Sequence, residues 1–268
     1  MTTQSRAHGA FAAVTTLFFT WGLVTSLIDP LVAAVKSIFS LSNVEAQLST
    51  SAFFIAYGLI SLPGAVLVSR LKAVRAILVA LLMMVLACLM ILAASNADTY
   101  HGVLLGLFVL ASGVTILQVA ANPLAAALGP PERSHFRLTL SQAFNSLGTV
   151  VGPLLGASLL LRGLDGDGHG VLAGSQRFAA LRSIDTAFLI ICALILALGL
   201  FIWAMRRRIR AAAPPPAPAQ TLADTIRAGF ASRWALLGGL AIFVYVGAEV
   251  AIGTQMALFL HDPSVWAI

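Results

Sequence analysis

The sequence is poor in charged residues and in cysteine. Asp, Glu, Lys and Arg make up 10% of its 268 residues, whereas soluble globular domains carry about 25%. With 59% hydrophobic residues and a mean hydropathy of +0.96, a soluble fold would leave large apolar patches in water. Cys88 and Cys192 stand alone in separate apolar stretches, which argues against a disulfide framework or a cysteine-based metal site. The composition therefore predicts a chain embedded in a lipid bilayer.

Long hydrophobic runs recur along the whole chain. Seven of them are 18 to 27 residues long, and about 20 apolar residues suffice for a helix to cross the hydrocarbon core. They cover residues 11–35, 48–68, 77–94, 103–128, 138–161, 186–205 and 234–260. The runs lack the alternation of transmembrane strands, and a helix satisfies its own backbone hydrogen bonds in lipid. We therefore expect an all-α, polytopic membrane protein.

The basic residues are distributed unequally between alternate loops. Twelve of the 16 Lys and Arg residues lie in the N-terminal tail or in the second, fourth and sixth loops, and four lie in the loops between these. Basic loops stay on the cytoplasmic side of a membrane, so the N-terminus is expected there. Topology thus explains the net charge of +6 without a nucleic-acid partner. The histidines fall at or beyond the ends of the runs, which argues against membrane-embedded haem.

Residues 206–233 differ from the rest of the chain. Four arginines come first, and an Ala/Pro stretch follows over residues 211–219, which favours extended, semi-rigid spacing. We interpret this segment as a basic cytoplasmic linker between a six-helix N-terminal bundle, residues 1–205, and a second unit, residues 234–268. A second unit of one helix cannot enclose a pathway, so we expect an incomplete C-terminal bundle, truncated after its first helix.

Two acidic residues lie within the expected spans, where an ionised group is costly and usually faces a bundle interior or a wet cavity. Asp29 precedes Pro30 in the first run, and proline removes a backbone donor and loosens the helix. Glu249 lies midway along the last run, near Gly247. Both are candidates for proton coupling. The alternatives are an interfacial aspartate at a helix end, and structural pairing of Glu249 with another helix.

Neutral amides share helix faces in two of the expected spans. Gln118 and Asn122 are four residues apart, and Gln142 and Asn145 are three apart, so each pair lies on one face. Amides donate and accept hydrogen bonds, which suits the hydroxyls of a sugar, although hydrogen bonding between helices explains them equally well. Within the runs the sequence has no cluster of His, Cys and acidic residues. We therefore expect no metal, no cofactor and no enzymatic activity.

Several segments together resemble the fucose/glucose/galactose permease branch of the major facilitator superfamily. The resemblance extends from about residue 18 to residue 260, and it includes the basic linker between six helices and a seventh. It is carried by residues 117–123 (LQVAANP), 128–130 (LGP), 135–138 (HFRL), 142–148 (QAFNSLG) and 245–249 (YVGAE).

The resemblance implies uptake of a hexose across a bacterial-type inner membrane by cation symport, usually with protons, through alternating access of two bundles. Asp29 matches an aspartate linked to protonation and sugar recognition, and Gln142 and Asn145 match sugar-contacting amides. Gln118 stands where fucose-transporting members have a membrane-buried acid. This difference favours a glucose- or galactose-like substrate and leaves Asp29 to couple protons alone or with Glu249. Sugar, proton and lipid bilayer are the partners implied.

A second departure from the superfamily lies between the second and third runs. A glycine usually occupies the tight basic turn there, and Lys72 stands in its place, which puts the usual conformational latch in question.

Two other functions remain open: a truncated membrane remnant that inserts but transports nothing, and a major facilitator exporter of another small solute.

Overall fold

The computed structural model describes residues 3–27, 31, 35, 36, 39, 41–160, 175–215, 218 and 221–260. The chain forms two compact units, Met1–Ala219 and Gln220–Ile268. The described residues are helical apart from turns and short connections, and they contain no strand. This agrees with the all-α fold expected from the hydrophobic runs.

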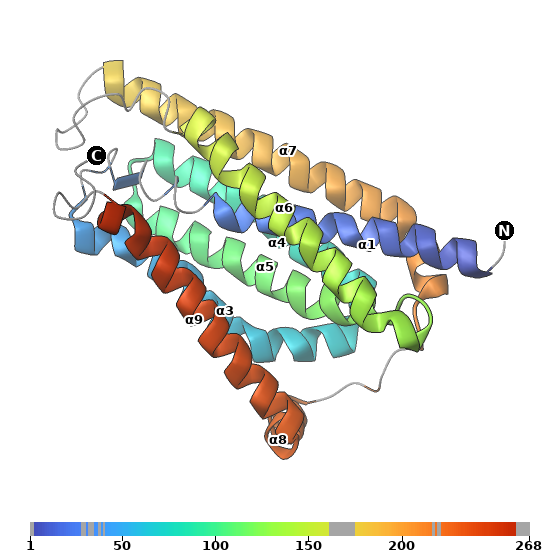
Figure 1. The fold of residues 1–268 in the computed structure, drawn as a ribbon. Helices are drawn as coiled ribbons and strands as arrows, with labels where there is room; N and C mark the ends of the chain where they lie inside the picture. The colour runs from blue at the N-terminus through green and yellow to red at the C-terminus, as the bar shows by residue number, and fades with distance from the viewer. Residues whose placement is uncertain are drawn as a thin grey trace. The chain divides into compact units, whose positions relative to one another are not determined.

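Six long helices form the described part of the first unit, and Figure 1 shows them side by side as a bundle. They are α1 (Thr3–Ser26), α3 (Asn43–Leu71), α4 (Ala73–Asn96), α5 (Tyr100–Ala127), α6 (Ser134–Leu160) and α7 (Ser175–Ala212), with a 3-10 turn at Pro131–Arg133 before α6. Within the bundle α4 packs against α5 and α7, α1 packs against α6 and α7, and α3 packs against α5. In the second unit α8 (Leu222–Ala231) contacts α9 (Arg233–Leu260).

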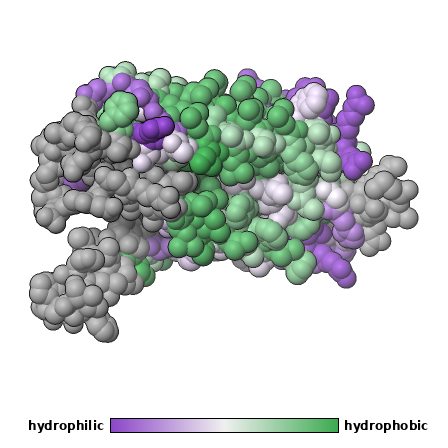
Figure 2. Space-filling model, turned by 90° about the horizontal axis from the view of Figure 1, so that it is seen from above, coloured by the Kyte–Doolittle hydropathy of each residue, from purple (hydrophilic) through white to green (hydrophobic). Residues whose placement is uncertain are grey.

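Five of the described helices are long and apolar enough to cross a membrane, namely α1, α3, α4, α5 and α7. The pair formed by α8 and the first part of α9 is bent by 89° and would add a sixth if it is one span. At 27 residues α6 is also long enough to cross the hydrocarbon core. On the face in Figure 2, hydrophobic residues form a broad band between hydrophilic residues toward the two ends.

The helix α7 extends beyond the hydrophobic run that predicts it. The run ends at Met205, whereas the helix continues through four arginines to Ala212. The end of an apolar run marks the edge of the lipid and not the end of the helix, because arginine and alanine are both good helix formers. Pro214 follows soon after the last turn and cannot continue a helix. The arginines are therefore held in helical register with the apolar residues before them.

Lys72 forms the whole connection between α3 and α4. Its φ is 67° and its ψ is 152°, a conformation open almost only to glycine that costs other residues about 1 to 3 kcal/mol. Its amide donates to the carbonyl of Val68 and so closes the last turn of α3. The sequence thus has a lysine in place of the expected glycine, at a position whose backbone conformation favours glycine.

We expect Lys72→Gly to raise the free energy of unfolding by about 1 kcal/mol, because relief of the strained φ exceeds the added flexibility of glycine in the unfolded chain. Thermal unfolding of the purified protein in detergent measures this as a rise in Tm of about 2 to 4 °C. Lys72→Ala removes the same charge and keeps the strain, so its Tm should stay close to that of the parent. Equal Tm values for the two variants would contradict the argument.

Candidate functional site

Three helices of the first unit bring polar side chains into contact with one another. The Gln118 Nε2 on α5 donates to the Tyr57 hydroxyl on α3 at 3.3 Å. One turn further along α5, the Asn122 Oδ1 accepts from the Gln142 Nε2 on α6 at 3.3 Å. Tyr57, Gln118 and Asn122 are half-buried and Gln142 is exposed. We call these four residues the amide cluster.

The helix α5 holds the centre of this cluster. Gln118 and Asn122 point the same way because they are four residues apart, as the sequence predicts. Pro123 lies inside α5 and has no amide hydrogen, so the carbonyl of Val119 lacks its usual donor four residues later. This adds a backbone acceptor one turn from Pro123, on the part of α5 that carries the two amides.

Tyr57 is a member of the cluster that sequence reasoning missed. A tyrosine hydroxyl within a span needs a hydrogen-bond partner, and this requirement is the signal that could have found it.

The start of α3 is fixed by a capping box in which Ser42 and Glu45 bond each other's backbone amides, and hydrogen bonds from Ser42 lower the pKa of the Glu45 carboxyl. The hydroxyl of Tyr100 on α5 also donates to the Glu45 carbonyl at 2.5 Å, which ties α3 to α5.

Asn145 lies apart from the amide cluster, at the contact between α1 and α6. Its Nδ2 donates to the carbonyl of Phe18 on α1 at 3.3 Å, and its backbone and side chain pack directly on Gly22. Of the two readings open for this residue, the hydrogen bond between helices is the one that the structure displays. Trp21 is 5% exposed, and its ring centroid lies 4.3 Å from that of Phe18, so it packs in the core.

The two acidic candidates, Asp29 and Glu249, differ in how far the structure describes them. Asp29 lies outside the described residues. Glu249 lies in α9, in the second unit, and is exposed. Of the predicted site residues, Asn122 and Gln142 are therefore bonded to each other, and Gln118, one turn away on α5, is bonded to Tyr57.

The cluster is suited to hydrogen bonding and not to metal binding. Amides and a phenol both donate and accept, and they remain uncharged in a low-dielectric interior. Across the residues with described positions, no group of three His, Cys, Asp or Glu residues could hold a metal ion. Cys88 and Cys192 are buried and free, as their isolated positions in the sequence predict.

Fold and cluster together define a class of protein, a polytopic helical membrane protein in which neutral polar side chains of several helices face one another. Residues 11–264 match the Major Facilitator Superfamily. The chain belongs to that superfamily, which confirms the membership and fold class expected from its sequence.

Curated relatives of this chain are sugar transporters by name. It is 40% identical to a glucose/galactose transporter of Brucella abortus over 98% of this chain and 61% of the relative. It is 31% identical to the L-fucose-proton symporter of Escherichia coli over 92% of this chain and 59% of the relative. The chain thus spans about three fifths of the length of these relatives.

Solved structures of the Escherichia coli fucose:proton symporter FucP resemble this fold. One gives a TM-score of 0.68 at 27% identity and covers 93% of this chain and 62% of that one. Another, in the outward conformation, gives a TM-score of 0.63 at 33% identity over 72% of this chain and 49% of that one.

Proposed function

We propose that this protein takes up a hexose, glucose- or galactose-like in preference to fucose-like, by proton-coupled symport through alternating access. The observation that carries the proposal is the amide cluster, in which α3, α5 and α6 present donors and acceptors to one another. The names of the relatives support a sugar as the substrate. Gln118 supports a glucose- or galactose-like sugar, because fucose-transporting members have an acid at this place.

The chemistry of the cluster suits a sugar hydroxyl array. A hydroxyl both donates and accepts, and each of the three amides can do the same. The bonds that join them are long at 3.3 Å, so a sugar hydroxyl can replace one of them with a shorter bond. Residues of a second bundle would close over the sugar. Asn145 supports this site by fixing α1 against α6, and it reaches sugar only if its bond to Phe18 opens.

We assign proton coupling to Asp29, acting alone or with Glu249. Protonation removes a charge whose burial is costly, so a carrier loaded with proton and sugar occludes more readily than one loaded with sugar alone.

We assign the N-terminus to the cytoplasmic side of a bacterial inner membrane, in keeping with the basic residues on that side. We divide the chain into an N-terminal bundle of residues 1–205, a linker of residues 206–233 and the start of a second bundle at residues 234–268, with the last turns of α7 and the helix α8 inside the linker.

Sugar binding by the purified chain in lipid nanodiscs tests the site. We expect radiolabelled D-glucose or D-galactose to bind, and Gln142→Leu and Gln118→Leu each to raise Kd about tenfold, because each variant loses one or two hydrogen bonds worth about 1 kcal/mol apiece. Thr115→Val is the matched control: it lies on α5, is buried, and bonds only the Ala111 carbonyl of its own helix at 2.8 Å. Its Kd should stay unchanged.

Two outcomes of this experiment would contradict the proposal. Equal affinities of the Gln142→Leu and Thr115→Val variants would remove the amide cluster from the sugar site. Binding of the lipophilic cation tetraphenylphosphonium in place of any hexose would indicate an exporter. Uptake by the 268-residue chain beside the same chain extended through a full second bundle then separates a transporter from a membrane remnant that only binds.

Proton coupling is tested in vesicles with an imposed pH gradient. We expect Asp29→Asn to abolish accumulation of sugar above its equilibrium level, because an amide cannot take up the coupling proton. Asp98→Asn, in the turn between α4 and α5, is the control and should accumulate sugar like the parent. Accumulation by Asp29→Asn that still follows the pH gradient, at normal expression, would assign the proton to another group.

A further inference from the structure

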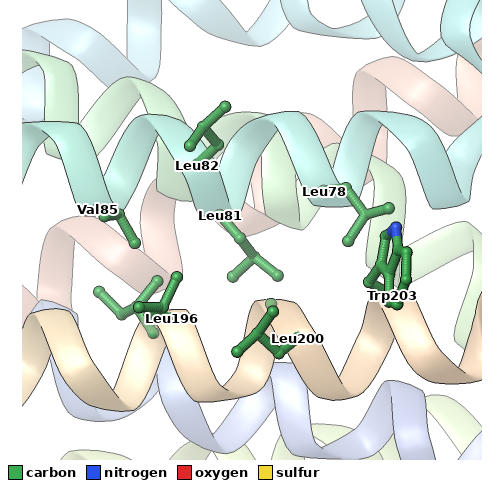
Figure 3. Close-up of a pocket in the computed structure, with 9 residues that line it drawn as sticks. Leu78, Leu81, Leu82, Val85, Leu196, Leu200 and Trp203 are labelled. Atoms are coloured by element: carbon green, nitrogen blue, oxygen red, sulfur yellow. The ribbon is translucent and has the colours of Figure 1, made fainter.

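A surface groove runs between α4 and α7, and Figure 3 shows its lining. Its volume is about 290 Å³, close to the lower end of the roughly 300 to 1,000 Å³ typical of small-ligand pockets. The walls are aliphatic, from Leu78 to Val85 on α4 and from Ile195 to Leu200 on α7, and Trp203 lies at one end. On the α7 side the groove includes Gly199, which has no side chain to fill it. Leu200 and Trp203 are 61% and 54% exposed, so the groove opens on the surface of the bundle.

One end of this groove is basic. In Figure 3 Leu78 lies beside Trp203 and Val85 lies near Leu196, so the two helices run antiparallel along the groove. Arg75 precedes Leu78 by one turn on α4, and Arg206 and Arg207 follow Trp203 by one turn on α7. Residues three or four apart share a helix face. All three arginines therefore lie at the end marked by Trp203, and none lies at the other end.

Arg206 is held at that end by the tryptophan. Its guanidinium carbon lies 3.8 Å from the Trp203 ring centroid, and its Nη1 donates to the Trp203 carbonyl at 2.5 Å. A guanidinium has five N–H donors, so most remain available for an anion. Among the residues that the structure describes, no acidic side chain forms an ion pair with Arg75, Arg206 or Arg207. The mouth of the groove thus carries three positive charges that no acidic side chain of the described residues pairs with.

We propose that this groove binds one anionic glycerophospholipid, with an acyl chain along α4 and α7 and the phosphate between Arg75, Arg206 and Arg207. The order of the groups along the groove matches that of a lipid. Aliphatic side chains come first, then a tryptophan of the type found at membrane interfaces, then guanidinium groups that bind phosphate oxygens in pairs. The charge complementarity selects an anionic headgroup over a zwitterionic one. The proposal is independent of the sugar site.

The test uses tryptophan fluorescence and brominated lipids, which quench a tryptophan that they touch. Trp203 is kept as the single tryptophan by substituting Phe at the other three positions, and the protein is reconstituted with brominated phosphatidylglycerol or brominated phosphatidylcholine. We expect phosphatidylglycerol to associate about fivefold more strongly, because each basic residue near the surface attracts anionic lipid. The preference should fall as salt rises, since salt screens exposed charges.

Two variants separate the headgroup contacts from the groove itself. Replacing Arg75, Arg206 and Arg207 by Gln should bring the ratio of the two association constants to about one. Gly199→Leu should fill the groove and lower quenching by both lipids. The packing tolerates a side chain there, because a Cβ at this position would lie 3.9 Å from the Leu81 Cβ. A second protein, with Trp234 as its single tryptophan, is the control for a tryptophan beside one arginine. The guanidinium carbon of Arg233 lies 5.3 Å from the Trp234 ring centroid, and Trp234 should show a smaller preference for phosphatidylglycerol.

Equal quenching of Trp203 by both lipids would overturn the proposal, since the groove would then hold only ordinary boundary lipid. If neither lipid quenched Trp203, the proposal would be overturned too, because the groove would be covered by protein. A preference that survives Gly199→Leu unchanged would show that the arginines recruit lipid without the groove.

Discussion

Arg137→Ala is expected to lower the free energy of unfolding by about 3 to 5 kcal/mol and Tm by about 10 °C. The side chain is 6% exposed, and its guanidinium lies among backbone carbonyls at the end of α5. Nε donates to Ala125 at 3.3 Å and Nη1 donates to Pro130 at 2.9 Å. Nη2 donates to Ala126 and, at 3.4 Å, to Gly129.

The size of this effect follows from what remains when the side chain is removed. The last carbonyls of a helix have no partner within the helix, and a buried acceptor left without a donor costs about 1 to 3 kcal/mol. A cation at a helix C-terminus also interacts favourably with the helix dipole. Arg137 belongs to α6, so the same contacts fix the start of α6 against the end of α5. Because Asn122 and Gln142 lie on these two helices, the variant should also weaken sugar binding.

Two further variants test whether the fork of the guanidinium matters. Arg137→Lys keeps the charge but carries its donors on one nitrogen, which cannot reach carbonyls spread around the helix end; we expect it to recover a minor part of the loss. Arg133→Ala removes an exposed arginine of the preceding 3-10 turn and should change stability by no more than about 0.5 kcal/mol. A lysine variant as stable as the parent would show that charge alone suffices.

The helices could be predicted from the sequence because lipid imposes a simple rule on composition. Continuous apolar runs identified the long helices of the first unit and α9. The ends of helices follow other rules. α7 continues seven residues past its run to Ala212, because arginine lies outside the lipid but still favours a helix. α1 ends at Ser26, before the last residues of its run. The turn at Lys72 was recognised as a departure, but only its positive φ explains why glycine suits it.

The candidate site could be predicted in part. The spacing of Gln118 and Asn122 fixed their common face, since periodicity along one helix is visible in a sequence. The sequence could not say which neighbouring helix each amide would meet. That depends on packing between α3, α5 and α6, which brings Tyr57 to Gln118 and turns Asn145 away to Phe18.

The glycines of α6 should give the other large effect. Gly148→Ala is expected to lower the free energy of unfolding by about 3 kcal/mol, the upper end of what overpacking costs. A Cβ on Gly148 would overlap the carbonyl oxygen of Phe19 and lie 2.8 Å from the amide nitrogen of Leu23 on α1. One turn along, a Cβ on Gly152 would overlap the Ser26 hydroxyl. These are backbone and near-backbone atoms, so the helices must separate to make room.

Separation of α1 from α6 would affect the site through Asn145, because its amide bonds the Phe18 carbonyl only while the two helices are this close. The 3.5 Å hydroxyl contact between Thr15 and Ser141 depends on the same approach. Sugar affinity should therefore fall together with Tm in Gly148→Ala. Gly9→Ala, on α1 with no other atom within 4 Å of the added Cβ, should leave both unchanged or raise Tm slightly, because alanine favours the helix. A Gly148→Ala protein with the Tm and affinity of Gly9→Ala would mean that α1 and α6 can separate without cost, and that Asn145 has no part in fixing the site.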